Sequence, residues 1–125
     1  MEKILIVDDL VANSRALALL LRGLGYQVAT AESGAAALDM LSCERIALVL
    51  LDLMMPDMNG MDVLKTMRAD PRLRALPVVI YSATETFRDE AMELGAQNFV
   101  IKGHAETFTM LRQAIEHQVG RTSHA

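Results

Sequence analysis

Short apolar runs rich in β-branched residues alternate five times with longer stretches of helical pattern, and this alternation constrains the fold most. The apolar runs are 4–7, 26–28, 46–51, 78–81 and 99–101. The helical stretches are 11–24, 33–41, 59–68, 85–94 and 106–119. Strands that alternate with helices predict a parallel sheet covered on both faces. The expected fold is therefore α/β, a doubly wound (βα)5 domain with a five-stranded parallel sheet.

Two details support these assignments. The run LVLL at 48–51 is apolar without interruption, which is typical of a strand buried on both faces. In the last helical stretch, apolar residues recur at helical spacing. They are Phe108, Leu111, Ile115 and Val119.

Length and composition indicate one domain. The chain has 125 residues, of which 52% are hydrophobic. We expect residues 1–120 to form the domain and residues 121–125 to be a disordered tail. The whole chain has a formal net charge of −4, and its basic residues are scattered. Both features argue against nucleic acid as a direct partner. No apolar stretch approaches the roughly 18 residues that span a bilayer.

The chain contains a single cysteine, Cys43, so no disulfide can form within it. A lone thiol fits a reducing compartment. The start of the chain leads directly into a predicted strand, so we expect no signal peptide or transit peptide. We therefore expect a cytoplasmic protein. Cys43 itself is expected to be a small buried residue on a helix.

Polar residues stand where the predicted strands end. Asp8 and Asp9 follow the first strand, Asp52 ends the third, Ser82 follows the fourth and Lys102 follows the fifth. Right-handed crossovers bring the carboxyl ends of parallel strands to one edge. In the order 2-1-3-4-5, the first and third strands lie side by side at the crevice where ligands bind.

This set of residues has a specific chemistry. Three neighbouring carboxylates repel one another unless a cation is present, and Mg²⁺ takes oxygen ligands together with a phosphate oxygen. A lysine and a serine hydroxyl can both contact a phosphoryl group. Together they describe a site that forms an aspartyl phosphate. Taken singly, the carboxylates could be helix caps, the serine a turn residue and the lysine a solvated side chain.

The motifs ILIVDD (4–9), LVLLDLMMPDMNG (48–60), PVVIYSA (77–83) and ELGAQNFVIK (93–102) resemble the receiver domain of two-component response regulators. The resemblance covers essentially the whole chain and implies the flavodoxin/CheY-like strand order 2-1-3-4-5. It implies that Asp52 is the phospho-acceptor. It also implies a Mg²⁺ site of Asp9, Asp8 (through water), Asp52 and the backbone carbonyl of Met54.

The same resemblance implies roles at the fourth and fifth strands. Ser82 would be the switch hydroxyl, Lys102 the lysine that pairs with the phosphoryl group, and Phe99 the aromatic residue whose rotamer follows Ser82. The phosphoryl donor would be a sensor histidine kinase or a histidine phosphotransferase. A downstream target protein would read the fourth helix, fifth strand and fifth helix. The chain would catalyse only its own phosphorylation and dephosphorylation.

The chain departs from the family pattern at two places. Lys102 is followed by Gly103 where the family usually has proline, so we expect a trans peptide, and Lys102 could be looser or displaced. His104 could then approach the phosphate side, although an ordinary exposed histidine is favoured. The segment from Ser82 to Lys102 is shorter than usual, and the shortening falls at 83–88. A bulky Met54 could also shield the acyl phosphate from water.

Other functions fit less well. A pseudo-receiver, an interaction module that is not phosphorylated, usually lacks part of the acidic set that this chain retains. Hydrolases that form an aspartyl phosphate need a second Asp two residues after the nucleophile, where this chain has Met54. A dinucleotide-binding domain would have GxGxxG after the first strand, and none is present.

Overall fold

Ten elements alternate along the chain, as the sequence predicts. The computed structural model describes residues 3–54 and 60–119. The strands are β1 (Lys3–Val7), β2 (Gln27–Ala31), β3 (Leu48–Leu51), β4 (Val78–Ser82) and β5 (Asn98–Ile101). The helices are α1 (Val11–Gly23), α2 (Gly34–Cys43), α3 (Gly60–Ala69), α4 (Arg88–Glu93) and α5 (Thr107–Val119).

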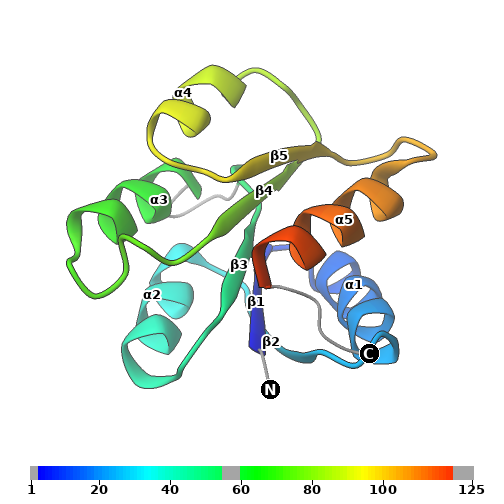
Figure 1. Cartoon of the computed structure of the whole chain (residues 1–125), viewed down its shortest axis with the longest axis horizontal. Coiled ribbons are helices and arrows are strands. Elements are labelled where there is room, and N and C mark those ends of the chain that lie inside the picture. The colour runs from blue at the N-terminus through cyan, green and yellow to red at the C-terminus, as the bar shows by residue number, and fades with distance from the viewer. Residues whose placement is uncertain (1–2, 55–59, 120–125) are drawn as a thin grey trace.

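The strands form one parallel sheet of order β2-β1-β3-β4-β5. Helices α1 and α5 cover one face, and α2, α3 and α4 cover the other (Figure 1). The predicted fold class and strand order are thus confirmed. Because all strands are parallel, their carboxyl ends lie at one edge of the sheet.

Two hydrophobic clusters fill the space between the sheet and the helices. In β1, Ile4 and Ile6 belong to the cluster under α1 and α5, whereas Leu5 and Val7 belong to the cluster under α2 and α3. The same alternation in β3 explains why LVLL is apolar at every position, since a central strand buries both of its faces. The predicted stripe on α5 also packs against the sheet, with Leu111 and Ile115 fully buried.

Three local predictions were wrong. The second strand spans Gln27–Ala31, not 26–28. It is an edge strand that is only partly buried, so alanine and threonine serve where a central strand needs larger apolar residues. Helix α4 begins at Arg88, not at Glu85. Cys43 is exposed at the last position of α2, not buried, because it falls outside the stripe of Ala37 and Leu41 that faces the sheet.

Some predictions fall outside the described residues. These are the Pro-Asp turn after Met54, the expected start of the third helix at Asn59 and the tail at 121–125. Within the described part of the chain, no helix is long and apolar enough to span a membrane.

Candidate functional site

The predicted polar residues do meet at the carboxyl edge of the sheet. Asp8 directly follows β1, Asp52 directly follows β3, Ser82 is the last residue of β4 and Lys102 directly follows β5. Asp8, Asp52 and Ser82 are buried, with 1%, 6% and 0% of their surface exposed. Buried polar side chains at the end of an apolar sheet are costly unless they are paired, so their partners define the site.

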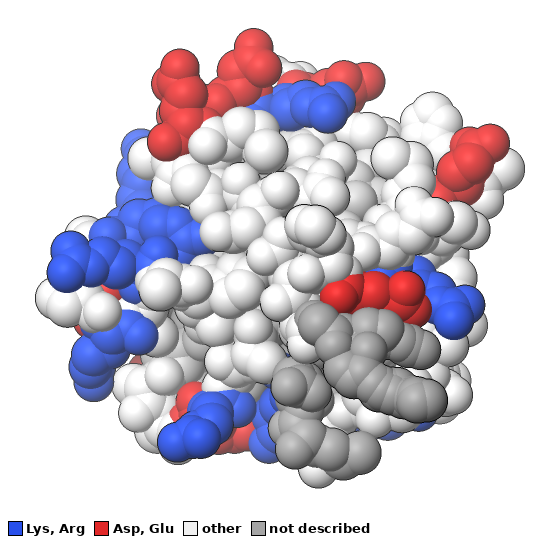
Figure 2. All heavy atoms as spheres, viewed as in Figure 1, with Lys and Arg blue, Asp and Glu red and all other residues white. Residues whose placement is uncertain are grey.

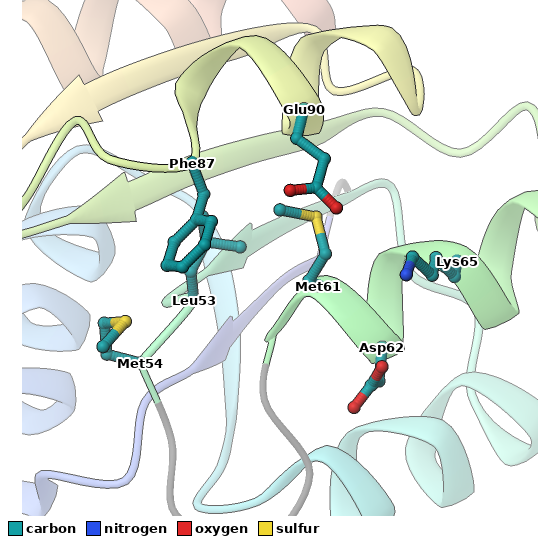
Figure 3. Close-up of a pocket in the computed structure, with 7 residues that line it drawn as sticks. All are labelled: Leu53, Met54, Met61, Asp62, Lys65, Phe87 and Glu90. Carbon is teal, nitrogen blue, oxygen red and sulfur yellow. The ribbon is translucent and has the colours of Figure 1, made fainter.

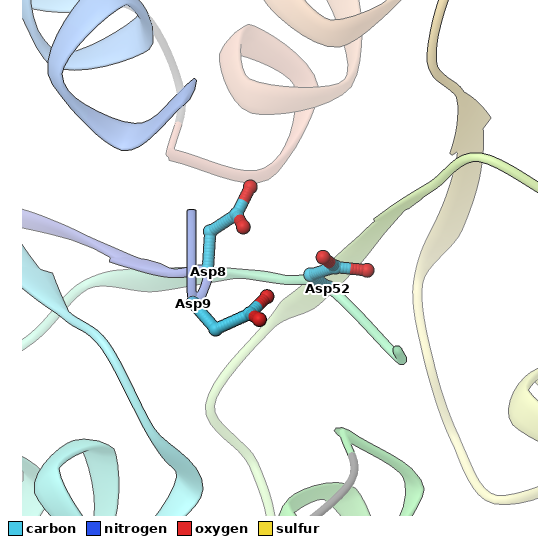
Figure 4. A group of neighbouring side chains, drawn as sticks. All are labelled: Asp8, Asp9 and Asp52. Atoms are coloured by element: carbon cyan, nitrogen blue, oxygen red, sulfur yellow. The ribbon is translucent and has the colours of Figure 1, made fainter. Parts of the chain in front are cut away.

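Three carboxylates form the centre of this site. One oxygen each from Asp8, Asp9 and Asp52 lie within 4.8 Å of one another. Figure 4 shows Asp8 and Asp9 reaching from the loop after β1 toward the same space as Asp52. Charges this close repel one another, and only a cation between or beside them offsets the repulsion.

Lys102 supplies part of the positive charge that offsets the repulsion between these carboxylates. Its Nζ donates to Asp8 Oδ2 at 3.1 Å and to Asp52 Oδ2 at 3.3 Å, so it bridges two of the three carboxylates. The other oxygens of this pair accept backbone hydrogen bonds: Asp8 Oδ1 from the N–H of Leu10 and Asp52 Oδ1 from the N–H of Met54. These bonds fix the orientation of both carboxylates.

The environment shifts the pKa of two of these groups. Burial raises the pKa of Asp52 and outweighs the Met54 hydrogen bond and the Lys102 charge, while the charge of Asp8 adds to the rise. For Lys102, burial alone would lower the pKa, but Asp8 and Asp52 together more than offset it and raise the pKa above its ordinary value. The Lys102 side chain therefore stays charged, and burial disfavours the ionised form of Asp52.

The Lys102–Gly103 peptide is trans, as predicted, and Gly103 takes a φ of +87°. Lys102 is not displaced, because its Nζ contacts both carboxylates and its backbone N–H donates to Ser82 O at 2.8 Å. His104 is exposed, as favoured, and its N–H donates to Thr107 Oγ1 at the start of α5.

Ser82 ends the strand next to β3, and Phe99 lies within β5. The Ser82 hydroxyl oxygen accepts a 3.4 Å hydrogen bond from the N–H of Thr84. Phe99 is buried already, with 3% of its surface exposed, and the Arg88 guanidinium lies 5.8 Å from its ring centroid. Because Phe99 is already buried, phosphorylation could not move it from an exposed to a buried position in this structure. Its role in the switch stays a prediction.

The sequence interpretation missed one neighbour of the site, Tyr81. Lys102 Nζ lies over its ring, 4.9 Å from the centroid. The contact follows from the register of the sheet, because Tyr81 pairs with Val100 and Lys102 is two residues further along on the same face. The signal that would have found it is an aromatic residue next to Ser82, on the strand beside β5.

A hollow of about 560 Å³ opens next to Asp52, between α3 and α4 (Figure 3). Its lining residues are Leu53, Met54, Met61, Asp62, Lys65, Phe87 and Glu90. Met54 is 54% exposed on this hollow. Whether Met54 shields an acyl phosphate stays a prediction.

Comparison with known proteins identifies the family. A family model, that of the response regulator receiver domain, matches residues 4–116. The chain belongs to this family. Chemotaxis protein CheY of Pseudomonas aeruginosa is 41% identical to this receiver domain over 118 residues, covering 91% of the chain and 93% of CheY.

Longer relatives contain the receiver domain as a part. Response regulator PleD of Caulobacter vibrioides is 39% identical over 102 residues, which are 80% of this chain but 22% of PleD. Among solved structures, response regulator TrrA of Thermotoga maritima, in complex with Mg²⁺-BeF, matches with a TM-score of 0.85 and 27% identity. That match covers 94% of this receiver domain and 99% of TrrA.

Proposed function

We propose that this receiver domain accepts a phosphoryl group from a phosphohistidine onto Asp52. The observation that carries the proposal is the arrangement of Asp8, Asp9 and Asp52 within 4.8 Å, with Lys102 bridging two of them. Asp52 is rigidly placed, because it ends a buried strand and its N–H donates to Val7 O on the neighbouring strand. Its raised pKa is consistent with a carboxylate that gains from the arrival of a cation.

The residues present fit a Mg²⁺ ion. Three carboxylates with one ammonium leave a net negative charge in a buried site, and hard carboxylate oxygens are the ligands that Mg²⁺ prefers. In this proposal Asp9 and Asp52 bind the ion directly, Asp8 binds through water, and the Met54 carbonyl is a further ligand. The ion would neutralise charge on the phosphoryl oxygens. The similarity to TrrA, solved with Mg²⁺-BeF, supports this assignment.

The transfer requires few catalytic groups. An Oδ atom of Asp52 attacks phosphorus, the new O–P bond forms as the N–P bond of the donor breaks, and the imidazole leaves with the electron pair and takes up a proton. Lys102 moves from the carboxylates to a phosphoryl oxygen, and Ser82 donates its hydroxyl to another. Positioning and charge neutralisation supply most of the catalysis in such transfers.

The switch in this proposal starts at Ser82. Turning the hydroxyl toward the phosphoryl group breaks the hydrogen bond from Thr84 and so moves the segment that leads into α4. Acidic side chains gather over α4 on the face shown in Figure 2, and α4 contributes Asp89, Glu90 and Glu93, all exposed. A target protein that reads α4, β5 and α5 would therefore meet a negative surface at α4.

The partners are the remaining part of the proposal. The phosphoryl donor would be a sensor histidine kinase or a histidine phosphotransferase. The free, exposed thiol of Cys43 supports a cytoplasmic location. Catalysis would be limited to the phosphorylation and dephosphorylation of the chain itself.

The direct test is intact mass after incubation with Mg²⁺ and a small acyl-phosphate donor. We expect a mass gain of one phosphoryl group that disappears with EDTA and in Asp52→Asn. Asp39→Asn, a change at an exposed aspartate on α2, is the matched control and should be phosphorylated like the unaltered chain. A folded protein that gains no mass would overturn the proposal and favour an interaction module that works without phosphorylation.

A further inference from the structure

The contact between Tyr81 and Lys102 is not among the roles that the resemblance to receiver domains implies. Tyr81 stands one residue before Ser82 on β4, on the face that packs against α1 and α5. It is half-buried, and burial raises the pKa of its phenol, so the ring is neutral at physiological pH. A neutral aromatic face next to a partly buried ammonium favours a cation–π contact, for which the distance of 4.9 Å is suitable.

Among the residues that the structure describes, the recorded partners of the Lys102 ammonium are the Tyr81 ring and two carboxylates. These carboxylates are Asp8 and Asp52, and both would be taken up by Mg²⁺ or by phosphorylation. The next residue, Gly103, has a φ of +87° and no atom within 4 Å of the position a Cβ would take. Gly103 has no side chain that could pack against Lys102, and a lysine side chain has considerable rotamer freedom.

We propose that Tyr81 is a positioning residue for Lys102, which rests on the proposed phosphorylation of Asp52. The ring holds the ammonium at the site while its salt-bridge partners change, because the attraction of a ring face for a cation does not depend on the charge of the carboxylates.

The first readout is independent of activity. A proton held over an aromatic face experiences a ring current, so the Cε protons of Lys102 should be shifted upfield in the NMR spectrum of the metal-free protein. We expect the shift in the unaltered chain and in Tyr81→Phe, and its loss in Tyr81→Leu. An unshifted Lys102 signal in the unaltered chain would overturn the contact itself, whether or not Asp52 is phosphorylated.

The second readout is the rate of phosphorylation by a small acyl phosphate at saturating Mg²⁺. Tyr81→Leu should lower the rate by about fivefold to thirtyfold, the range expected when a largely desolvated cation–π contact is lost. Tyr81→Phe keeps the ring and should retain the rate. Tyr26→Leu removes another half-buried tyrosine that packs against the same cluster. Tyr26 directly precedes β2, two strands away from β3 in the sheet, and the change should leave the rate unchanged.

A double-mutant cycle shows whether Tyr81 acts through Lys102. In a Lys102→Met background, Tyr81→Leu should cause no further loss of rate. An equal loss in both backgrounds would show that Tyr81 is only a packing residue. A loss in Tyr81→Phe as large as that in Tyr81→Leu would assign the effect to the hydroxyl and would contradict the role of the ring. Absence of phosphorylation in the unaltered chain would contradict the proposed function and the catalytic role of Tyr81, while the NMR result would still stand.

Discussion

At the scale of single residues, the site holds more negative charge than the metal-free protein can offset. Asp8, Asp9 and Asp52 face one ammonium, that of Lys102. Burial raises the pKa of Asp52 above its ordinary value of 3.8, so the ionised form of this side chain destabilises the folded state. A functional group that lowers stability is a common feature of binding sites.

This imbalance predicts that Asp52→Asn stabilises the metal-free protein at neutral pH by about 1–3 kcal/mol, the usual scale for a buried polar group that is poorly compensated. The asparagine oxygen can still accept the N–H of Met54, and Lys102 keeps Asp8. Denaturant unfolding in EDTA at pH 7 measures the difference. A less stable Asp52→Asn variant would mean that the Lys102–Asp52 pair outweighs the cost of burial.

The pH dependence has a definite sign. The folded state binds the Asp52 proton more tightly than the unfolded state, so the contribution of Asp52 to stability is fully present below pH 3.8 and is lost as pH rises through the raised pKa of the folded protein. The advantage of Asp52→Asn should therefore shrink as pH falls toward 3.8. An advantage that stays constant with pH would assign it to packing and not to charge.

At the scale of elements, β3 and α3 meet at a point where only glycine fits. A Cβ on Gly60 would overlap the carbonyl oxygen of Asp52 and lie 2.7 Å from Leu53 Cα. The Gly60 N–H also donates to Leu53 O at 3.0 Å. The start of α3 is thus packed directly against the backbone that carries the phospho-acceptor of the proposed function.

Gly60→Ala is therefore expected to lower the free energy of unfolding by about 1–3 kcal/mol, the usual cost of overpacking. It should also weaken Mg²⁺ binding, because relief of the clash moves Asp52. Gly23→Ala is the matched control, since nothing lies within 4 Å of its Cβ position at the end of α1. Denaturant unfolding and calorimetric titration with Mg²⁺ compare the two variants. Equal stability and equal Mg²⁺ affinity in both would contradict the proposed clash at Gly60.

A second pair of elements is joined by Arg68 in the last turn of α3. Its guanidinium donates to Leu76 O at 3.0 Å, to Gly95 O at 2.8 Å and to Gln97 Oε1 at 3.3 Å. Gln97 Oε1 also accepts the N–H of Val78 at 2.7 Å. Arg68 thereby links the segment before β4 to the turn between α4 and β5, and it anchors the carboxyl end of α4.

Arg68→Met should destabilise the protein by about 2 kcal/mol, because it leaves partly buried carbonyl groups without a charged donor. Arg72→Met removes an exposed arginine whose partner is Asp70 on the surface, and it should cost much less stability, because exposed ion pairs contribute little. Thermal or denaturant unfolding of the two variants tests the prediction. Similar losses would show that the Arg68 bonds add little.

The start of α4 shows where helical periodicity is insufficient. Thr84 and Thr86 hydrogen-bond to each other through their hydroxyls, and the Thr86 N–H donates to Thr84 Oγ1. Such local bonds compete with helix formation, so the helix starts only at Arg88. The threonines were visible in the sequence, but their mutual contact depends on how β4 delivers the chain to this point.

At the scale of the whole molecule, topology made the site predictable. Parallel strands place their carboxyl ends together, so Asp8, Asp52, Ser82 and Lys102 were expected at one edge without any knowledge of side-chain contacts. The contacts of Tyr81 with Lys102 and of Arg68 with Gly95 were not predicted in this way. They depend on side chains that meet across strands and loops, and such contacts leave no periodic pattern in the sequence.

Identification of the phosphorylated carboxylate shows directly whether Asp52 is the phospho-acceptor. Treatment of the phosphorylated protein with a borohydride reduces an acyl phosphate, releases phosphate and converts that aspartate to homoserine, which peptide mass mapping then locates. We expect homoserine at position 52 and at no other aspartate, and only after incubation with Mg²⁺ and an acyl-phosphate donor. Homoserine at Asp8 or Asp9, or none in a protein that has gained a phosphoryl group, would contradict it.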